Sequence, residues 1–254
     1  MALPDSSILT NIYFAGNENP GNSLFEKKYI TIRCMENRLY SDMEMMNLPD
    51  ISPEHTHAGE WVVRKRSCLR LIHHLTEKKK RLQILEPGCG NGWLSHCLAG
   101  IPDAEVTGLD INFTELQQAA RVFNENERLR FIYGDLESGV LNGRKFDCIV
   151  FAAAIQYFHS LRETMGFCLK LLKSGGEIHL LDSPFYEEEE IEAAKQRTFL
   201  YYDSLGYPEM CDHYFHHDIN DLKGFRYHIL QNPNSLFNKF WGNRDCFHWI
   251  CIKK

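Results

Sequence analysis

Residues 82–92 read LQILEPGCGNG, a short apolar run that breaks into an acidic residue and three alternating glycines. The run predicts a β-strand, and the glycines predict a tight loop that leads into a helix over about residues 93–99. Glycine tolerates positive φ and lets a ligand approach the backbone, so Gly88, Gly90 and Gly92 suggest a loop around a small ligand. The unpaired N–H groups at the start of the helix would favour a carboxylate or phosphate.

The spacing of the glycines separates the classes of ligand. A dinucleotide loop of the form G-x-G-x-x-G would place its third glycine at Trp93, whose ring is too bulky for close packing of helix on strand. A P-loop would need a Gly-Lys-Ser/Thr sequence, which does not follow. NAD and a P-loop nucleotide are therefore disfavoured, and a tight strand–helix turn without a ligand is the alternative.

Length and composition fit one α/β domain with an appendage. The chain has 254 residues, a formal net charge of −6 and nine cysteines, which show no paired C-x-x-C spacing. The net charge argues against a general nucleic-acid binder, and the cysteine pattern argues against disulfides and a zinc site. No run approaches the ~20 apolar residues of a membrane span, and the start lacks a signal-peptide pattern, so we expect a cytoplasmic protein that binds no membrane.

From residue 82 onward, strand and helix patterns alternate, as a doubly wound parallel sheet requires. The predicted strands cover 82–86, 105–110, 130–133, 146–151 and 177–182. Asn112 and Glu115 have the spacing of an N-cap and its reciprocal partner, and Ser160 caps a helix that is predicted to end at Gly175-Gly176.

Two later features complete the predicted sheet. Pro184 and the acidic run 187–190 start a helix that reaches Leu205. Segments 225–230 and 247–252 fit an antiparallel pair beside the parallel strands. The predicted fold is therefore α/β, with a doubly wound, seven-stranded, mostly parallel sheet.

The N-terminal part lies outside this alternation. Residues 1–22 show no sustained period and predict a loop, for which Tyr13 and Phe14 are the candidate anchors. Ser23–Glu26 has the form of a capping box, and apolar residues at near-helical spacing predict one helix or two short ones before Pro49. We expect this part to be a helical cover.

A segment near the C-terminus, residues 206–217, is unusually aromatic and rich in histidine for a connection. It could roof the pocket of an acceptor molecule. A zinc site at His213, His216 and His217 is an alternative, although adjacent histidines point in different directions and no thiolate pair accompanies them. We therefore predict no metal.

The predicted division of the chain follows from these segments. Residues 1–58 form the N-terminal helical cover or lid, and residues 59–254 form the ligand-binding domain, which opens with a helix over about 59–78. Within that domain, residues 206–224 form a lid insertion on the substrate side.

Acids follow two of the predicted strands. Asp110 ends the second strand, 24 residues after Glu86, where an acid can accept hydrogen bonds from both hydroxyls of a ribose. Asp135 follows the third strand, where a carboxylate could accept from the exocyclic amine of adenine. Each acid alone could be an ordinary cap or turn residue. Because open parallel sheets bind ligands beyond the carboxyl ends of their strands, the two acids together favour a nucleoside-like ligand.

Five stretches follow one another over about residues 82–182, namely LEPGCGNG, GLD, GDLE, FDCIVFAAAIQYF and LLKSGGEIHLLD. In this order they resemble the motifs of class I S-adenosylmethionine-dependent methyltransferases of the small-molecule type. The resemblance implies a Rossmann-like methyltransferase fold with S-adenosyl-L-methionine as cofactor. It also implies an enzyme that transfers a methyl group to a small-molecule acceptor by in-line displacement.

The resemblance assigns the residues that hold the cofactor. In the family the glycine loop holds the methionine part, the acid after the second strand holds the ribose, and the acid after the third strand holds the adenine amine. Carried over to this sequence, the cofactor-binding residues are Glu86, Gly88, Cys89, Gly90, Asn91, Gly92, Asp110, Ile111, Asp135, Leu136 and Ala152.

The stretch after the fourth strand departs from two family patterns. It lacks the Asn/Asp-Pro-Pro-Tyr signature of amide and base N-methyltransferases, and Gln156 and Tyr157 stand where many small-molecule members have a His pair. His159 is the candidate general base, with Tyr157 as a second candidate catalytic residue and an ordinary surface histidine as the alternative. The candidate substrate-binding residues are Tyr13, Tyr207 and Tyr214.

Two other classes of function stay open at this stage. One is a non-catalytic module that binds S-adenosylmethionine and serves as a partner or sensor, which the alanine-rich stretch after the fourth strand allows. The other is a methyltransferase that acts on protein or RNA, although the net acidity weighs against RNA. The predicted partner is a small-molecule acceptor, with no nucleic acid, and a homodimer is kept open as the assembly.

Overall fold

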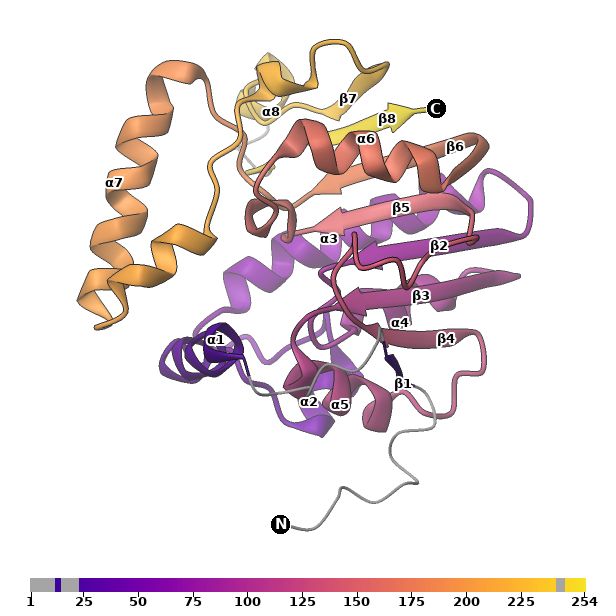
Figure 1. Cartoon of the computed structure of the whole chain (residues 1–254), viewed down its shortest axis with the longest axis horizontal. Coiled ribbons are helices and arrows are strands. Elements are labelled where there is room, and N and C mark those ends of the chain that lie inside the picture. Colours follow the sequence, from indigo (N-terminus) through magenta and orange to yellow (C-terminus); the bar gives the residue numbers. More distant parts are fainter. Residues whose placement is uncertain (1–11, 15–22, 241–244) are drawn as a thin grey trace. The chain divides into compact units, whose positions relative to one another are not determined.

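The structure is a computed structural model that describes residues 12–14, 23–240 and 245–254. The chain separates into two compact units, residues 1–146 and 147–254. Strands and helices alternate through much of both units (Figure 1). None of the described helices is long and apolar enough to cross a membrane.

The described residues of the first unit form four strands and five helices. The strands are β1 (Ile12–Phe14), β2 (Leu82–Pro87), β3 (Ala104–Asp110) and β4 (Leu129–Tyr133). The helices are α1 (Leu24–Met35), α2 (Asp42–Asn47), α3 (Ala58–Thr76), α4 (Trp93–Ala99) and α5 (Phe113–Val122).

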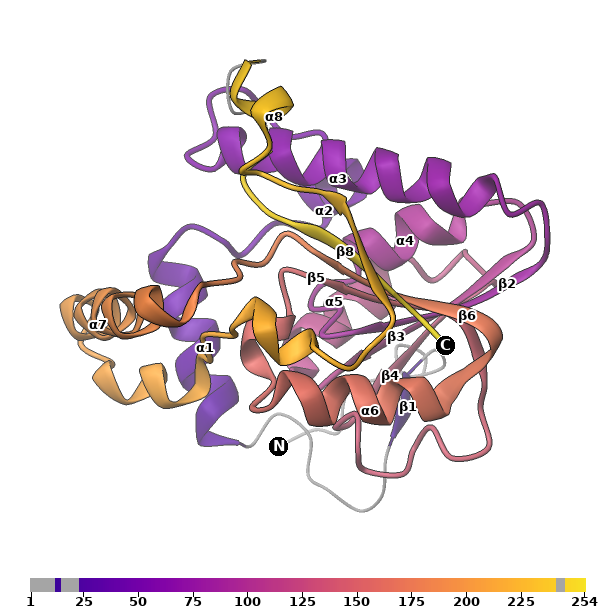
Figure 2. The ribbon, with the colours of Figure 1, turned by 90° about the horizontal axis from the view of Figure 1, so that it is seen from above.

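The strands of the first unit lie in the order β1-β4-β3-β2 and pair in parallel. Their central side chains are buried: Ile84 and Val106 are 0% exposed and Phe131 is 1% exposed. Burial on both faces explains why these strands read as nearly continuous apolar runs. Helices α3 and α4 lie side by side (Figure 2), where the rings of Trp61 and Trp93 meet edge to face at 5.1 Å.

The loop predicted over residues 1–22 is wrong at residues 12–14, which form β1 and pair with β4. Ile12 is buried, whereas Tyr13 is 50% exposed and is not the anchor that we expected. The edge of β4 offers unpaired backbone groups, and a three-residue strand that satisfies them is too short to show a sequence period. The rest of the range, and the side chain of Phe14, lie outside the described residues.

Two short helices, α1 and α2, form the predicted helical cover. The Oγ of Ser23 accepts a hydrogen bond from the N–H of Glu26 at 3.0 Å, so the predicted cap of α1 is present. The capping box is complete in α2, where Ser41 and Glu44 bond each other's backbone N–H groups. In α1 it is half formed, because the carboxylate of Glu26 leaves its own helix and bonds α5.

Polar contacts dock this cover on α3 and α5. The indole of Trp61 donates to the hydroxyl of Tyr40 at 2.8 Å, and Arg38 meets Glu60 of α3 through two hydrogen bonds of 2.9 and 2.7 Å. Arg121 of α5 donates to Asp42 of α2 at 2.9 and 2.7 Å. The cover is therefore part of the folded first unit.

The second unit contains four strands and six helical segments among its described residues. The strands are β5 (Phe146–Ala152), β6 (Leu172–Leu181), β7 (Tyr227–Gln231) and β8 (Trp249–Lys253), where β5 begins at the boundary of the unit. The helices are η1 (Ile155–Tyr157), α6 (Leu161–Leu171), α7 (Glu188–Ser204), η2 (Pro208–His213), η3 (Ile219–Leu222) and α8 (Leu236–Phe240).

The strands of the second unit lie in the order β5-β6-β8-β7. Strand β8 pairs antiparallel with both β6 and β7, which confirms the predicted late antiparallel pair. Helix α7 ends before Gly206, and η2 then packs back along α7 (Figure 1).

The boundary between α6 and β6 was predicted wrongly. The helix ends at Leu171 and the strand starts at Leu172, so Gly175-Gly176 lies inside the strand. Leu172 is 1% exposed, and the carbonyls of Leu172 and Gly176 accept hydrogen bonds from Lys254. Packing and pairing with the C-terminal strand thus override the local helical pattern.

The fold class is confirmed as an α/β arrangement with a mostly parallel sheet and helices. The strands number eight among the described residues, where seven were predicted, because β1 adds one. The division into a cover at 1–58, a domain at 59–254 and an insertion at 206–224 stays a prediction.

Candidate functional site

The glycine loop lies at the carboxyl end of β2, as predicted. Gly88, Gly90 and Gly92 have φ of 72°, 52° and 75°, a region that is costly for side chains with a Cβ. The N–H groups of Gly88 and Cys89 donate to the carbonyl of Leu109 in β3, at 2.8 and 3.2 Å. These two hydrogen bonds hold the loop against the carboxyl end of β3.

The glycines of this loop serve different purposes. A Cβ on Gly92 would lie 2.7 Å from the ring of Phe131, so this glycine makes room for the core. A Cβ on Gly90 would find the Oε2 of Glu115 at 3.5 Å, which is an ordinary contact. An added side chain is therefore tolerated better by its neighbours at Gly90 than at Gly92, and the binding of a cofactor by either glycine stays a prediction.

Asp110 connects the glycine loop to the start of α5. Its Oδ2 accepts from the N–H of Gly90 at 2.7 Å, and its Oδ1 accepts from the N–H of Asn112 at 2.8 Å. Burial raises the pKa of Asp110 above its ordinary value, and the backbone hydrogen bonds oppose this rise. A carboxylate has about four acceptor positions, so the side chain can still hold a hydroxyl of a ligand.

The predicted cap at the start of α5 is present in altered form. Asn112 accepts from the N–H of Glu115 at 3.1 Å, but the N–H of Asn112 goes to Asp110. Glu115 instead accepts from the side-chain amide of Asn112 at 3.1 Å. Burial, and next the charge of Asp110, raises the pKa of Glu115 to about 7. Sequence reasoning took Glu115 for a helix cap and missed its place beside the loop.

Glu86, at the end of β2, is 3% exposed and accepts from the hydroxyl of Ser95 in α4 at 2.5 Å. Burial raises its pKa to about 8, and the bond from Ser95 opposes the rise. The acid is therefore largely protonated at neutral pH. Ser95 carried no sequence signal because its role depends on the packing of α4 against β2.

The other residues predicted in the loop face in different directions. Cys89 is buried with its Sγ beside Gly108, and burial raises the pKa of its thiol well above the usual value. Asn91 accepts from the N–H of Trp93, the first residue of α4, at 3.4 Å. Binding of a cofactor by these two residues stays a prediction.

The predicted adenine side of the site is more exposed. Ile111, which follows Asp110, is 46% exposed and offers an apolar surface. Asp135 is exposed, and its carboxylate accepts from the N–H of Glu137 at 2.8 Å, as in an ordinary turn. Leu136 beside it is buried. Binding of adenine by Asp135 therefore stays a prediction.

In the second unit, the loop after β5 is held by a residue whose role the sequence did not reveal. Ala152 is half-buried, and Ala153 after it has a φ of 51°, which is unusual for a residue with a Cβ. Gln156 is buried, donates to the carbonyl of Ala153 at 2.7 Å and accepts from Ser183 at 2.9 Å. Gln156 thus joins the loops after β5 and β6.

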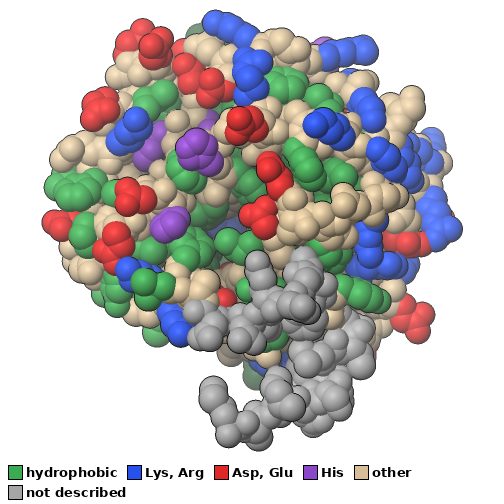
Figure 3. Space-filling model, viewed as in Figure 1, with side chains coloured by type: hydrophobic (Ala, Val, Ile, Leu, Met, Phe, Trp, Pro, Cys, Tyr) green, Lys and Arg blue, Asp and Glu red, His purple; other side chains and the backbone are tan. Residues whose placement is uncertain are grey.

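A pocket of about 910 Å³ lies within the second unit, between the start of α6, α7 and the segment after α7. Its lining includes His159, Tyr214 and Phe215. His159 is exposed and meets the ring of Phe215 edge on at 5.0 Å. Histidine side chains gather on the face over α7 and the segment that follows it (Figure 3).

Some of the candidate catalytic and substrate-binding residues lie close to one another, and others do not. Tyr157 meets Tyr214 edge to face at 5.9 Å, and Tyr214 lines the same pocket as His159. Tyr207 precedes η2 and does not belong to that lining, and Tyr13 belongs to the first unit.

The histidines of residues 213–217 are engaged separately. The Nε2 of His216 lies 2.9 Å from the hydroxyl of Thr198, and the Nε2 of His217 lies 2.9 Å from the carbonyl of Ile155. Burial lowers the pKa of both imidazoles. These bonds hold the segment in place, and they use one ring nitrogen of His216 and one of His217, two of the three histidines of the alternative zinc site.

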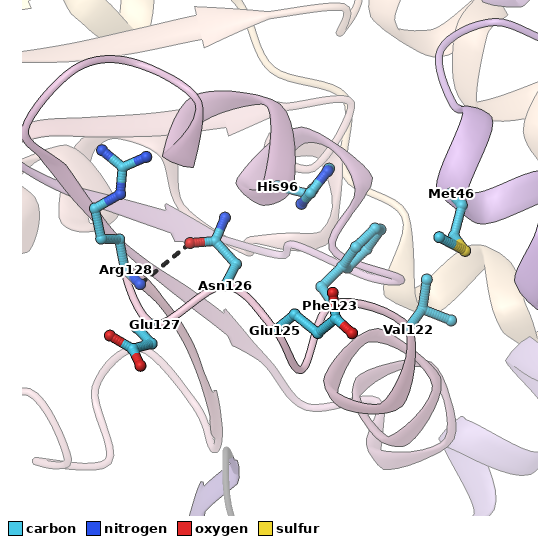
Figure 4. Close-up of a pocket in the computed structure, with 8 residues that line it drawn as sticks. All are labelled: Met46, His96, Val122, Phe123, Glu125, Asn126, Glu127 and Arg128. Atoms are coloured by element: carbon cyan, nitrogen blue, oxygen red, sulfur yellow. Dashed lines mark hydrogen bonds between the residues drawn. The ribbon is translucent and has the colours of Figure 1, made fainter.

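A second hollow, of about 580 Å³, lies in the first unit (Figure 4). The ring of His96 stacks on Phe123 at 4.3 Å there, and Met46 of α2 faces them. This hollow is at the C-terminal end of α5, whereas Asp110 and the glycine loop are at its N-terminal end. It is therefore separate from the glycine-loop site.

Comparisons with known proteins identify the stretch that carries this loop. Residues 84–176 match the family model of a methyltransferase domain. This stretch, which is less than half of the chain, is therefore similar to a methyltransferase domain. This confirms the resemblance, and S-adenosylmethionine is the cofactor of that family. The residues present fit the cofactor, because the glycine loop at the carboxyl end of β2 is bonded to Asp110, whose carboxylate can accept from a ribose hydroxyl.

Two curated relatives are malonyl-[acyl-carrier protein] O-methyltransferases. The one from Acetivibrio thermocellus is 35% identical over 116 residues, which are 45% of this chain and 40% of that protein. The one from Halalkalibacterium halodurans is 30% identical over 131 residues, or 48% of each. The chain thus spans less than half the length of these relatives.

A solved structure supports the fold. The YcgJ protein from Bacillus subtilis has a TM-score of 0.54 and 16% identity, over 73% of this chain and 98% of that protein. The agreement confirms the Rossmann-like methyltransferase fold.

Proposed function

We propose that this protein is an enzyme that transfers the methyl group of S-adenosylmethionine to a small-molecule acceptor. The observation that carries the proposal is the bond between the N–H of Gly90 and Asp110, within a domain of the methyltransferase family. This bond fixes the glycine loop beside an acid that retains capacity for ribose hydroxyls. We assign Gly88, Gly90 and Asp110 to the cofactor site on this basis.

The bound cofactor supplies an activated methyl group on a sulfonium sulfur. The task of the chain is then to bind the cofactor, to orient an acceptor and to exclude water, which can supply most of the acceleration. The glycine loop and Asp110 perform the binding. No histidine pair is needed for such a reaction, so the presence of Gln156 and Tyr157 does not oppose it.

The pocket of the second unit is our candidate for the acceptor. Its volume of about 910 Å³ and its mixture of aromatic and polar walls suit a small organic molecule. His159 is the candidate to take a proton from the acceptor, and Tyr214 and Phe215 are the candidates to hold it. Substitution of Phe215 by Ala should raise the KM for the acceptor and leave the affinity for the cofactor unchanged.

Two measurements test the proposed function. Calorimetry should detect binding of the demethylated product, S-adenosylhomocysteine, with a Kd near the micromolar range, or roughly −8 kcal/mol. A screen of acceptors by mass spectrometry should detect a gain of one CH₂ unit. Binding without turnover of any small molecule would favour the non-catalytic module or a protein acceptor. An absence of binding, or tighter binding of NAD, would overturn the proposal.

The assembly and the location belong to the same proposal. We propose a cytoplasmic enzyme, and a homodimer is the assembly to test. Light scattering of the purified chain measures the assembly, and fractionation of the source cells measures the location.

A further inference from the structure

The carboxylate of Glu26 is almost fully buried, with 2% of the residue exposed. Its sequence position, three residues after Ser23, suits a capping box, but the side chain does not return to its own helix. The Oε1 of Glu26 accepts from both the N–H and the hydroxyl of Thr114, each at 2.9 Å. Thr114 lies in the first turn of α5, four residues after Asp110. Helix α1 is thereby fixed at the carboxyl end of β3.

The second oxygen of the same carboxylate is the unexpected feature. The Oε2 of Glu26 is buried and takes no hydrogen bond from any described residue. A buried carboxylate oxygen without a donor is costly, because it has lost its hydration and gained nothing in return. Such an atom calls for a proton or for a donor that a ligand brings.

The surroundings of Glu26 belong to the cofactor site. Burial is the main cause that raises the pKa of Asp110 and of Glu115, and the charge of Glu26 adds a smaller rise to both, so the three carboxylates are close enough to repel one another. Asp110 already accepts from backbone N–H groups, including those of Gly90 and Asn112, so part of its acceptor capacity is used. A ribose with two hydroxyls beside Asp110 would therefore find a further acceptor in Oε2.

We propose that Glu26 is a further residue of the cofactor site, whose Oε2 accepts a hydrogen bond from a ribose hydroxyl of the cofactor. The proposal rests on the proposed function. It also assigns a role to α1: one oxygen of Glu26 fixes the helix to α5 and the other meets the ligand. Cofactor binding therefore strengthens the docking of the N-terminal cover.

The test compares two glutamates that occupy the same position in consecutive helices. Glu26 is the third residue of α1, and Glu44, which caps its own helix α2, is the third residue of α2. In Glu26→Gln the amide oxygen stays with the donors of Thr114, so the amide N–H₂ replaces Oε2 and cannot accept. Calorimetry with S-adenosylhomocysteine should show at least a tenfold weaker affinity for Glu26→Gln and less than a twofold change for Glu44→Gln.

Deoxy analogues of the ligand distinguish a direct hydrogen bond between Glu26 and the ribose from an effect that Glu26 has only through the fold. The unchanged protein should lose affinity for S-adenosylhomocysteine that lacks one ribose hydroxyl, and Glu26→Gln should be insensitive to the loss of that same hydroxyl. Equal sensitivity of both proteins to both deoxy analogues would show that Glu26 acts only through Thr114, and would overturn the proposal. If the unchanged protein fails to bind S-adenosylhomocysteine, this result contradicts the proposed function itself, whatever the role of Glu26.

Hydrogen exchange on the unchanged protein tests the proposal without a variant. Saturation with S-adenosylhomocysteine should slow exchange in α1 by at least fivefold, and α8 serves as the internal reference. Unaltered exchange in α1 would contradict the coupling, even if Glu26→Gln folded too poorly to be measured.

Discussion

Three acids at or after the ends of β2, β3 and β4 look alike in sequence but differ in their surroundings. Burial raises the pKa of Glu86 to about 8, although the hydrogen bond from the hydroxyl of Ser95 opposes this rise. Asp110 accepts from backbone N–H groups, and these bonds oppose the rise of its pKa by burial. Asp135 is exposed and closes a turn. The number and kind of hydrogen-bond donors, rather than the residue type, decide which acid can meet a ligand as a carboxylate.

The first prediction at this scale concerns Asp110. Asp110→Ala should weaken binding of S-adenosylhomocysteine at least tenfold and lower the free energy of unfolding by about 1–3 kcal/mol, because backbone N–H groups lose their acceptor. Calorimetry and denaturant unfolding measure the two effects. Asp135→Ala is the comparison, and it should cost little stability. If Asp110→Ala bound S-adenosylhomocysteine with unchanged affinity, the assignment of Asp110 to the ribose would be wrong.

The second prediction concerns substitutions of Gly90 and Gly92 by alanine. Gly92→Ala should destabilise the fold by about 2–5 kcal/mol, since overpacking against Phe131 adds to the strain of positive φ. Gly90→Ala should cost about 1–2 kcal/mol from φ alone and should weaken cofactor binding. Thermal unfolding with and without S-adenosylhomocysteine separates the effects. Phe131→Leu should restore part of the stability of Gly92→Ala, and failure to do so would contradict the packing role.

At the scale of elements, the N-terminal cover is fixed to α3 by a partly buried ion pair. Burial by itself would raise the pKa of Glu60, but hydrogen bonds from Arg38 and the charges of Arg64 and Arg38 lower it to about 2. The unfolded value is near 4.5. Because the folded pKa is the lower one, the ionised form stabilises the fold above about pH 4.5, and this contribution disappears as the pH falls towards 2.

The third prediction follows from that linkage. Glu60→Gln should lower the free energy of unfolding by about 1–3 kcal/mol at pH 7, and the difference from the unchanged protein should shrink steadily below pH 4.5. Urea unfolding between pH 2 and pH 7 measures the difference. Glu54→Gln, an exposed change in the same segment, should show no such trend. A constant difference for Glu60→Gln would mean that the ion pair does not hold the cover.

At the scale of the whole molecule, the segments outside the strand–helix alternation are the candidates to respond to ligand. Residues 23–48 and 206–217 both carry aromatic or apolar side chains on short helices and turns. A sulfonium cofactor must be shielded from water during transfer, which lids accomplish.

The fourth prediction is that S-adenosylhomocysteine slows proteolysis in both segments and leaves the strands resistant throughout. Mass mapping of limited digests, with and without ligand, measures it. Equal rates in the two conditions would show that the segments are permanently docked, and would shift weight towards the binding-module alternative.

The sequence by itself determined the strand–helix alternation and the cofactor loop. Apolar runs that end in glycine or an acid, as at Glu86 and Asp110, mark strand ends because local chemistry sets them: burial favours the run, and positive φ favours the glycine. Caps at Ser23, Asn112 and Ser160 were equally readable, since a cap needs only neighbours in sequence.

Only the tertiary structure decided the rest. The roles of Glu26, Gly92 and Gln156 depend on partners far away in the chain, namely Thr114, Phe131 and Ser183. The strand β1 and the early start of β6 exist because neighbouring strands offer backbone groups to pair with. Local patterns cannot reveal these features, because a glutamate that caps its own helix and one that crosses to another helix have the same sequence signature.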